Sequence, residues 1–196
     1  MPYRRQLLIA AITLSASSLC ASAAVRIEGQ TFDAAARVAG TELVLNGVGV
    51  RAVAWLKGYA AALYLPAKAA TPPQVLASVG AKRLQMRLLQ DVPAEEFVKA
   101  IDKGIERNTP ADELPALADR QALFERQVQA VGTVKKGDVV DLDFVPGRGL
   151  VFALNGKPRG DAIPGADLYA AVLRIFLGDK PIDARLKAGL LGGPVS

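Results

Sequence analysis

Arg51 and Tyr59 stand in an apolar part of the chain and have side chains that can hold an anion or a polar oxygen. Arg51 follows the apolar run 43–50. A guanidinium in such a segment must be paired or must face a polar cavity, because an unpaired buried charge is costly. Tyr59 stands between Gly58 and the alanines at 60–62, and small residues beside a tyrosine leave open volume for a ligand. The alternative is that Arg51 pairs with a surface carboxylate and Tyr59 belongs to the core.

The separation of Arg51 from Tyr59 leaves their relation open. Eight residues of straight strand span about 26 Å. The segment 52–57 contains no dipeptide typical of a tight hairpin turn. The spacing therefore does not decide whether the two side chains share one cleft.

The residue types that the chain lacks exclude several kinds of catalytic and metal site. The 196 residues include no histidine and one cysteine. This excludes Ser-His-Asp and Cys-His catalysis, His-ligated metal sites, an internal disulfide and CxxC chemistry. No glycine motif typical of a phosphate-binding loop occurs, and we expect neither a metal nor another cofactor.

Two strand segments carry charges that alternate with apolar residues. Asp141 and Asp143 share one face of the segment 138–144, and paired carboxylates can hold a cation, but the sequence shows no third ligand. Arg83 and Arg87 alternate with apolar residues in the same way. We expect all four side chains to lie on solvated strand faces.

Composition predicts one globular domain. Hydrophobic residues make up 51% of the chain and charged residues 22%, and a chain of this length buries roughly two thirds of its unfolded surface. The formal net charge of +5 is spread without a basic block. Such a distribution is a weak argument for nucleic acid, so we expect no nucleic-acid partner.

The N-terminal segment has the pattern of a signal peptide. Arg4 and Arg5 precede the apolar run 7–14, and Ala21-Ser22-Ala23 matches an A-x-A cleavage site. The competing interpretation, an N-terminal core helix, fits poorly because the run is apolar on all sides. We therefore expect a signal peptide over residues 1–23, a domain over 25–196, and a periplasmic or secreted protein.

The remaining chain alternates between strand and helix patterns. Strands are predicted over 25–32, from 41 to 65 with glycine bends or bulges at 47, 49 and 58, over 83–88, and in a hairpin of 138–144 and 149–154. Helices are predicted from 72, 93 and 109 and over 167–176 and 183–191. This order predicts one α+β domain, an antiparallel sheet with helices covering one face.

Three segments resemble the chalcone isomerase-like proteins of bacteria: Leu45–Arg51, Tyr59–Pro66 and Phe176–Pro181. The similarity extends from about Val25 to Gly193. The resemblance implies an open-faced β-sandwich, with a large antiparallel sheet, a layer of helices on one face, and a cleft between them.

The resemblance also implies roles for individual residues. Plant chalcone isomerases stabilise enolate charge with an arginine and hold substrate oxygens with threonine, tyrosine and asparagine. Fatty-acid-binding relatives use the arginine and a tyrosine to hold a carboxylate. In this sequence the arginine corresponds to Arg51, the threonine to Tyr59, the tyrosine to a position near Phe97, the asparagine to one near Gly104, and a late Ser/Thr to one near Ile175. Apart from Arg51, the catalytic polar set is missing or replaced, which favours a binder over an isomerase.

The hypothesis is therefore a non-catalytic binding cleft for a small amphipathic ligand, a fatty acid or an aromatic acid. Its predicted lining is Arg51, Tyr59, Phe97, Ile101, Gly104 and Ile175. The charged head would meet Arg51 and the tail would bury apolar area. No catalytic residue is assigned. Two alternatives stay open, an isomerase or lyase for an unknown enone and a ligand-free interaction protein, and so does a peripheral contact with membrane lipids.

Overall fold

The computed structural model describes residues 23–53 and 56–194. The predicted signal peptide lies almost wholly outside these residues. Among the described residues, no helix is long and apolar enough to cross a membrane.

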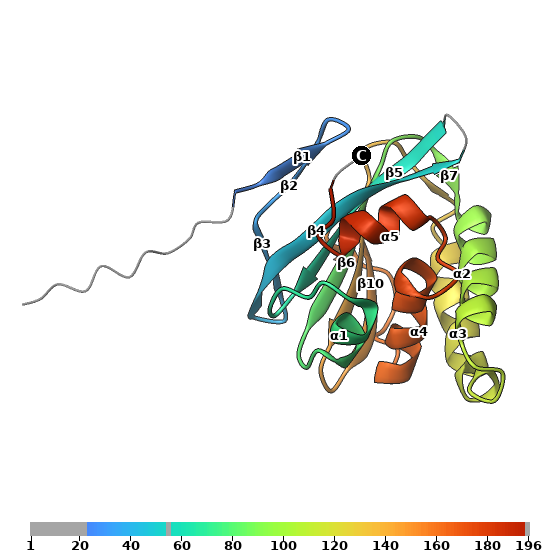
Figure 1. Ribbon diagram of the computed structural model, residues 1–196. Helices are drawn as coiled ribbons and strands as arrows, with labels where there is room; N and C mark the ends of the chain where they lie inside the picture. The colour runs from blue at the N-terminus through green and yellow to red at the C-terminus, as the bar shows by residue number, and fades with distance from the viewer. Residues whose placement is uncertain (1–22, 54–55, 195–196) are drawn as a thin grey trace, which may run out of the picture.

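A curled antiparallel sheet of seven strands forms the centre of the molecule (Figure 1). Its strand order is β11-β10-β9-β6-β5-β4-β3. The bounds are β3 Ala35–Val38, β4 Thr41–Val53, β5 Leu56–Leu65, β6 Lys82–Leu88, β9 Val139–Val145, β10 Gly149–Leu154 and β11 Lys157–Pro158. Two small pairs complete the strands: β1 (Val25–Ile27) with β2 (Gln30–Phe32), and β7 (Val92–Pro93) with β8 (Thr133–Val134).

The helices gather on one face of this sheet (Figure 1). They are α1 Pro72–Ala77, α2 Ala94–Asn108, α3 Leu114–Gln129, α4 Ala166–Leu177 and α5 Ala184–Leu190. In α2, Ile101 and Ile105 are buried one turn apart, while Glu95 and Glu96 are exposed in the first turn. The predicted α+β class, with an antiparallel sheet and helices on one face, is confirmed.

The alternation of side chains along the strands gives the sheet two apolar faces. On β6, Leu84, Met86 and Leu88 belong to the large core beneath the helices. On β5, Ala60, Ala62 and Tyr64 belong to a smaller core on the other face, which also includes Phe32 of the β1–β2 hairpin. The β1–β2 hairpin therefore contributes to a second core that the helices do not reach.

One predicted strand is a hairpin. The segment 25–32 reverses at Glu28 (φ 49°) and Gly29 (φ 74°), between β1 and β2. Positive φ at both central residues is the geometry of a type I′ turn, whose usual signal is Asn-Gly or Asp-Gly. The sequence Glu-Gly is a weaker signal, so the alternation of 25–32 was consistent with one strand.

The glycines of β4 allow a helix to approach the backbone. Gly47 follows a β-bulge, but neither Gly47 nor Gly49 has a positive φ. A Cβ at Gly47 would collide with the carbonyl oxygen of Gly189, and one at Gly49 would lie 3.0 Å from the carbonyl oxygen of Leu186. Both carbonyls belong to α5, so these glycines let α5 lie directly on β4.

The charged residues expected on solvated strand faces are buried or half-buried. Arg83 donates from Nε and Nη2 to the two carboxylate oxygens of Asp143, each at 2.7 Å. Asp141 accepts from Nε2 of Gln85 at 2.8 Å. Only 4% of Asp141 and 8% of Asp143 is exposed. The expectation was wrong because this face of the curled sheet carries its own core, and the charges are paired inside it.

Arg87 also lies on this face of the sheet. Its Cζ is 5.2 Å from the centre of the Phe32 ring, a cation–π distance. Its Nε is buried without a hydrogen-bond partner among the described residues. The arginine expected on a wet strand face therefore packs on an aromatic ring of the second core.

Candidate functional site

The long β4–β5 hairpin brings Arg51 and Tyr59 together. The two residues are directly paired in its register, and opposite residues of an antiparallel pair point to the same face. The spacing along the chain left this contact open, because the segment 52–57 contains no dipeptide typical of a tight hairpin turn. In the structure the two residues pair across the hairpin. Their side chains therefore start from adjacent positions on the helix-covered face.

A cavity of about 280 Å³ lies between the sheet and the helices. Most of its lining is apolar: Leu56, Met86, Val92, Phe97, Ala100, Ile101, Phe124, Val128, Val134, Val140, Leu142, Phe152, Val172, Ile175, Phe176 and Ile182. Polar groups come from Arg51, Tyr59, Gln90 and Glu96. A mainly apolar cavity with a few polar groups is typical of a site for a small molecule.

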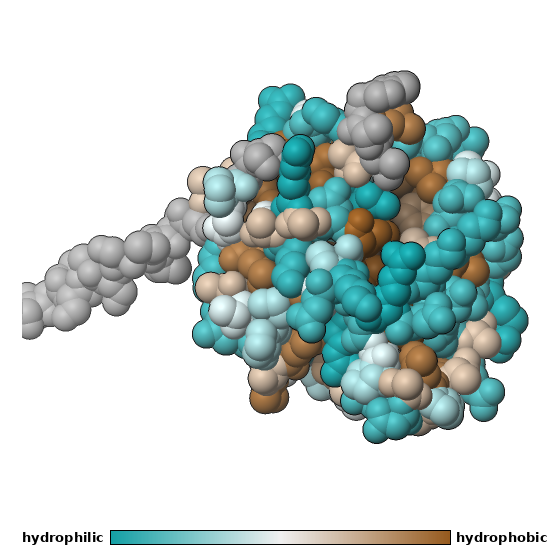
Figure 2. All heavy atoms as spheres, turned by 45° about the vertical axis from the view of Figure 1, so that its right-hand side comes forward, coloured by the Kyte–Doolittle hydropathy of each residue, from teal (hydrophilic) through white to brown (hydrophobic). Residues whose placement is uncertain are grey.

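The exposure of the lining distinguishes the mouth of the cavity from its closed end. Leu56 is 45% exposed and Glu96 is exposed, whereas Phe124 and Phe152 are 1% and 3% exposed. Figure 2 shows apolar atoms in a recess in the upper part of the visible face. The cavity therefore opens near the end of the β4–β5 hairpin and α2, and it closes against α3 and β10.

Among the described residues, Arg51 is only partly engaged. Its Nη1 donates to the carbonyl oxygen of Ala52 at 3.1 Å and lies 3.9 Å from Oδ2 of Asp183. Asp183 is occupied as the N-cap of α5, because its Oδ1 accepts from the backbone N–H groups of Arg185 (2.8 Å) and Leu186 (3.0 Å). A guanidinium has five N–H donors, so Arg51 keeps donors for a further acceptor.

Tyr59 supplies a neutral hydroxyl beside Arg51. Burial raises the pKa of Tyr59 well above its ordinary value, with Arg51 lowering it and Asp183 raising it further. The phenol therefore stays protonated at neutral pH and can donate a hydrogen bond. Arg51 and Tyr59 together can hold an anionic oxygen.

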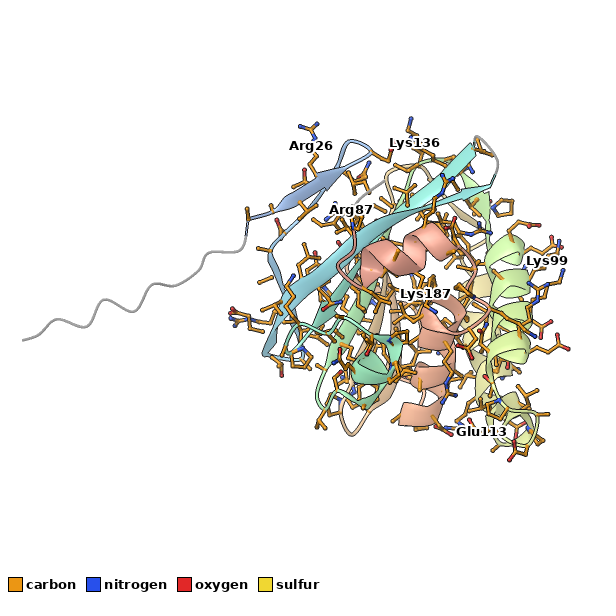
Figure 3. The ribbon with its side chains drawn as sticks, in the orientation of Figure 1. Arg26, Arg87, Lys99, Glu113, Lys136 and Lys187 are labelled. Carbon is orange, nitrogen blue, oxygen red and sulfur yellow. The ribbon has the colours of Figure 1, made fainter. Side chains whose placement is uncertain are left out.

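Charge at the mouth is partly compensated. Glu96 accepts a hydrogen bond from Lys99 at 3.0 Å, and Lys99 projects from the outer side of α2 (Figure 3). Both side chains are more than half exposed, so this pair is screened by water. Arg51, 24% exposed, is the cation in the cavity lining.

Five of the six predicted site residues line this one cavity: Arg51, Tyr59, Phe97, Ile101 and Ile175. Gly104 does not. A Cβ at Gly104 would lie 2.7 Å from Cγ2 of Ile175. Gly104 therefore allows α2 and α4 to pack closely behind the cavity wall, and its position is explained by helix packing.

Sequence reasoning missed Gln90, Asp183 and the closed end formed with Phe124 and Phe152. Asp183 precedes a predicted helix, and an aspartate there is a recognisable N-cap signal. Its proximity to Arg51, 132 positions earlier, has no local signal. Phe152 stands in a predicted strand and Phe124 on a predicted helix face, but only the packing of α3 on β10 brings the rings together.

The described part of the chain shows no metal centre. Within residues 23–53 and 56–194, no group of three or more His, Cys, Asp or Glu side chains could hold a metal ion. Asp141 and Asp143 are instead paired with Gln85 and Arg83.

Comparisons with known proteins agree on the architecture. Residues 24–192 match a family model described as chalcone isomerase-like. A solved structure of a fatty-acid binding protein from Arabidopsis thaliana is similar, with a TM-score of 0.63 over 86% of this chain and 95% of that chain. The sequence identity is 15%, so this likeness concerns the fold. No curated protein has a significantly matching sequence.

Proposed function

The chain belongs to the chalcone isomerase-like family, and from that premise we propose that it is a non-catalytic binder of a small amphipathic acid. The acid's carboxylate binds Arg51 and Tyr59 at the mouth of the cavity, and its tail lies among the apolar side chains between sheet and helices. The Arabidopsis structure of similar fold is that of a fatty-acid binding protein, which supports this class of ligand.

One observation carries the proposal: Arg51 and Tyr59 are register partners in the lining of an otherwise mainly apolar cavity. A carboxylate accepts charge-assisted hydrogen bonds from a guanidinium. The phenol donates a second bond without competing for the proton, because burial raises its pKa. Burying an alkyl tail contributes about 0.8 kcal/mol per methylene.

The isomerase alternative finds less support at the same positions. Phe97 and Ile175 line the cavity and offer no hydrogen-bonding side chain, and Gly104 lies outside the lining. Losing one well-placed donor commonly costs about 10²–10³ in rate. We expect chalcone isomerisation at or near background, followed by absorbance of a chalcone panel. A turnover number within the ordinary enzyme range, about 1–10³ s⁻¹, would overturn the non-catalytic assignment.

The test of binding compares an acid with its alcohol. Purified protein is titrated with decanoate and with decanol, after mass spectrometry of any lipid retained from expression. Arg51→Ala should weaken decanoate binding about 10- to 100-fold and leave decanol nearly unaffected, because a hydrogen bond to a charged group contributes about 1.5–3 kcal/mol. Arg51→Lys should restore part of the loss, since a point charge cannot hold both oxygens.

A matched control is Arg37→Ala. Arg37 is 70% exposed and pairs with Glu42 on the edge of the sheet, and it does not line the cavity. This variant removes the same charge and should bind decanoate like the wild type. If Arg51→Ala binds decanoate and decanol each with the wild-type affinity, Arg51 is not the anchor.

We also propose that the protein is exported, on the N-terminal pattern of residues 1–23. Expressed with its own N-terminus in a Gram-negative host, it should be recovered from the periplasm without the residues up to Ala23 or Ala24. Intact-mass analysis that finds Met1 on periplasmic protein would contradict this.

A further inference from the structure

The closed end of the cavity is made by two aromatic rings from different layers. Phe124 of α3 and Phe152 of β10 meet edge to face, with ring centres 6.2 Å apart and an angle of 78°. Both are almost fully buried, and both line the cavity. Edge-to-face packing is a favourable geometry for aromatic pairs, so the rings form a firm wall.

The volume of the cavity limits what can lie in front of that wall. Its 280 Å³ is close to the lower limit of about 300 Å³ for ligand pockets. An apolar cavity of about 150 Å³ holds a benzene molecule, which has six non-hydrogen atoms. By that comparison a cavity of 280 Å³ accommodates about eleven non-hydrogen atoms, which corresponds to a carboxylate with a tail of about eight carbons.

From this we infer that the protein selects acids with tails of about eight to ten carbons, and that Phe124 and Phe152 set the upper limit. This inference rests on the proposed function, and it adds the size class of the ligand. The anchor and the wall lie on opposite sides of the site, because Arg51 is on β4 and Phe152 is on β10, separated by β5, β6 and β9. A carboxylate held at Arg51 directs its tail toward the rings.

A homologous series measures the limit directly. Saturated straight-chain acids from six to sixteen carbons are titrated into the full chain below their micelle concentrations. Affinity should rise about fourfold per added methylene up to about ten carbons. It should then level off or fall, because longer tails meet the rings or must leave the cavity at its mouth.

Variants of the wall test which residues set the limit. Phe152→Leu removes ring atoms and should move the optimum about two carbons longer, and Phe124→Leu should act likewise. Val128→Phe adds a ring to the lining and should move the optimum shorter. Phe144→Leu is the matched control. Phe144 belongs to β9, the strand beside β10, packs against Tyr169 of α4, and lies outside the cavity lining. Its optimum should be unchanged.

Each outcome bears on a separate statement. An optimum near ten carbons that shifts with Phe152 and Phe124 but not with Phe144 supports the inference. An optimum at sixteen carbons, or an optimum that is unchanged in both the Phe124 and the Phe152 variants, overturns the inference about tail length. It leaves the acid-binding function intact. If no acid of any length binds, the proposed function itself fails. Val128→Phe remains informative should the leucine variants fold poorly.

Discussion

On the helix-covered face of the sheet, Arg51 makes one hydrogen bond to a backbone oxygen within residues 23–53 and 56–194, and it lies 3.9 Å from a carboxylate. On the opposite face, Arg83 makes two hydrogen bonds of 2.7 Å to one carboxylate and lies 3.6 Å from a second. The two side chains are similarly buried, 24% and 20% exposed. Burial alone therefore does not distinguish a structural arginine from one available to a ligand; the number of donors already satisfied does.

The electrostatics of the Arg83 pair agree with a structural role. Burial raises the pKa of Asp143, and the hydrogen bonds from Arg83 act in the opposite direction. The same hydrogen bonds raise the pKa of Arg83. The bidentate geometry is that of a charged pair. Arg83 is therefore needed to keep the buried carboxylate of Asp143 ionised.

The largest effect is expected from removing the structural cation. Arg83→Leu should lower the free energy of unfolding by about 3–5 kcal/mol, because Asp141 and Asp143 remain buried without their positive partner. Arg51→Leu should change it by less than about 1 kcal/mol, since its ion pair is long and partly exposed. Urea unfolding followed by circular dichroism measures both.

The double variant Arg83→Leu/Asp143→Leu provides the control. It should recover part of the lost stability, because replacing Asp143 as well removes one of the two carboxylates that Arg83→Leu leaves without a cation. Equal losses of unfolding free energy in Arg83→Leu and Arg51→Leu would contradict the distinction between a structural arginine on one face and an available arginine on the other.

A second effect concerns the tyrosines of β5, which point to opposite faces. Burial raises the pKa of Tyr64 to about 12, and that of Tyr59 also rises well above the ordinary value. An unfolded tyrosine ionises near pH 10. The folded state therefore retains a proton that the unfolded state loses, so the stabilisation is complete below pH 10 and is lost as the pH rises toward 12. For Tyr64 this amounts to roughly 2–3 kcal/mol.

Urea midpoints at pH 9, 10 and 11, with phenolate absorbance at 295 nm, measure this loss. Tyr64→Phe should flatten the alkaline decline, while lysine titration continues in both proteins. A phenolate signal near pH 10 in the folded protein that Tyr64→Phe removes would show that the second core is open to water.

The smallest effect concerns the helix that supports Arg51. Gly47→Ala should destabilise the protein by about 1–3 kcal/mol, because the new methyl group would push against the backbone of α5. Displacing α5 also moves Asp183, so decanoate affinity should change with it. Gly58→Ala is the control for stability alone, since its Cβ would lie 3.7 Å from the nearest atom but Gly58 itself lines the cavity. Thermal midpoints that fall equally in both variants would contradict the close packing of α5 on β4.

The architecture was predictable because the signals that create it are local. Alternation in the segment 138–144 and a four-residue recurrence from Phe97 gave a strand and a helix where the structure has β9 and α2. The resemblance of Leu45–Arg51 to a known family then predicted the arrangement in layers, a sheet with helices on one face.

The site was predictable only in part, because its geometry depends on distant contacts. Phe97 and Ile175 were expected at the cleft and line it. Gly104 was expected beside them, but whether a glycine faces a cavity or a neighbouring helix depends on how α2 and α4 cross. The buried state of Asp141 likewise depends on the second core, which the missed β1–β2 hairpin helps to build.

The seat of α5 on β4 also bears on the order in which the molecule assembles. Asp183 accepts from the backbone of Ala52, and Asn46 donates to the carbonyl oxygen of Leu190, across 131 and 144 positions of sequence. Closing loops of this length costs entropy that the docked helix must offset, and such contacts slow folding. The anchor of the cavity is therefore completed by the end of the chain, and a polypeptide still lacking α5 has the strands of the site without its finished mouth.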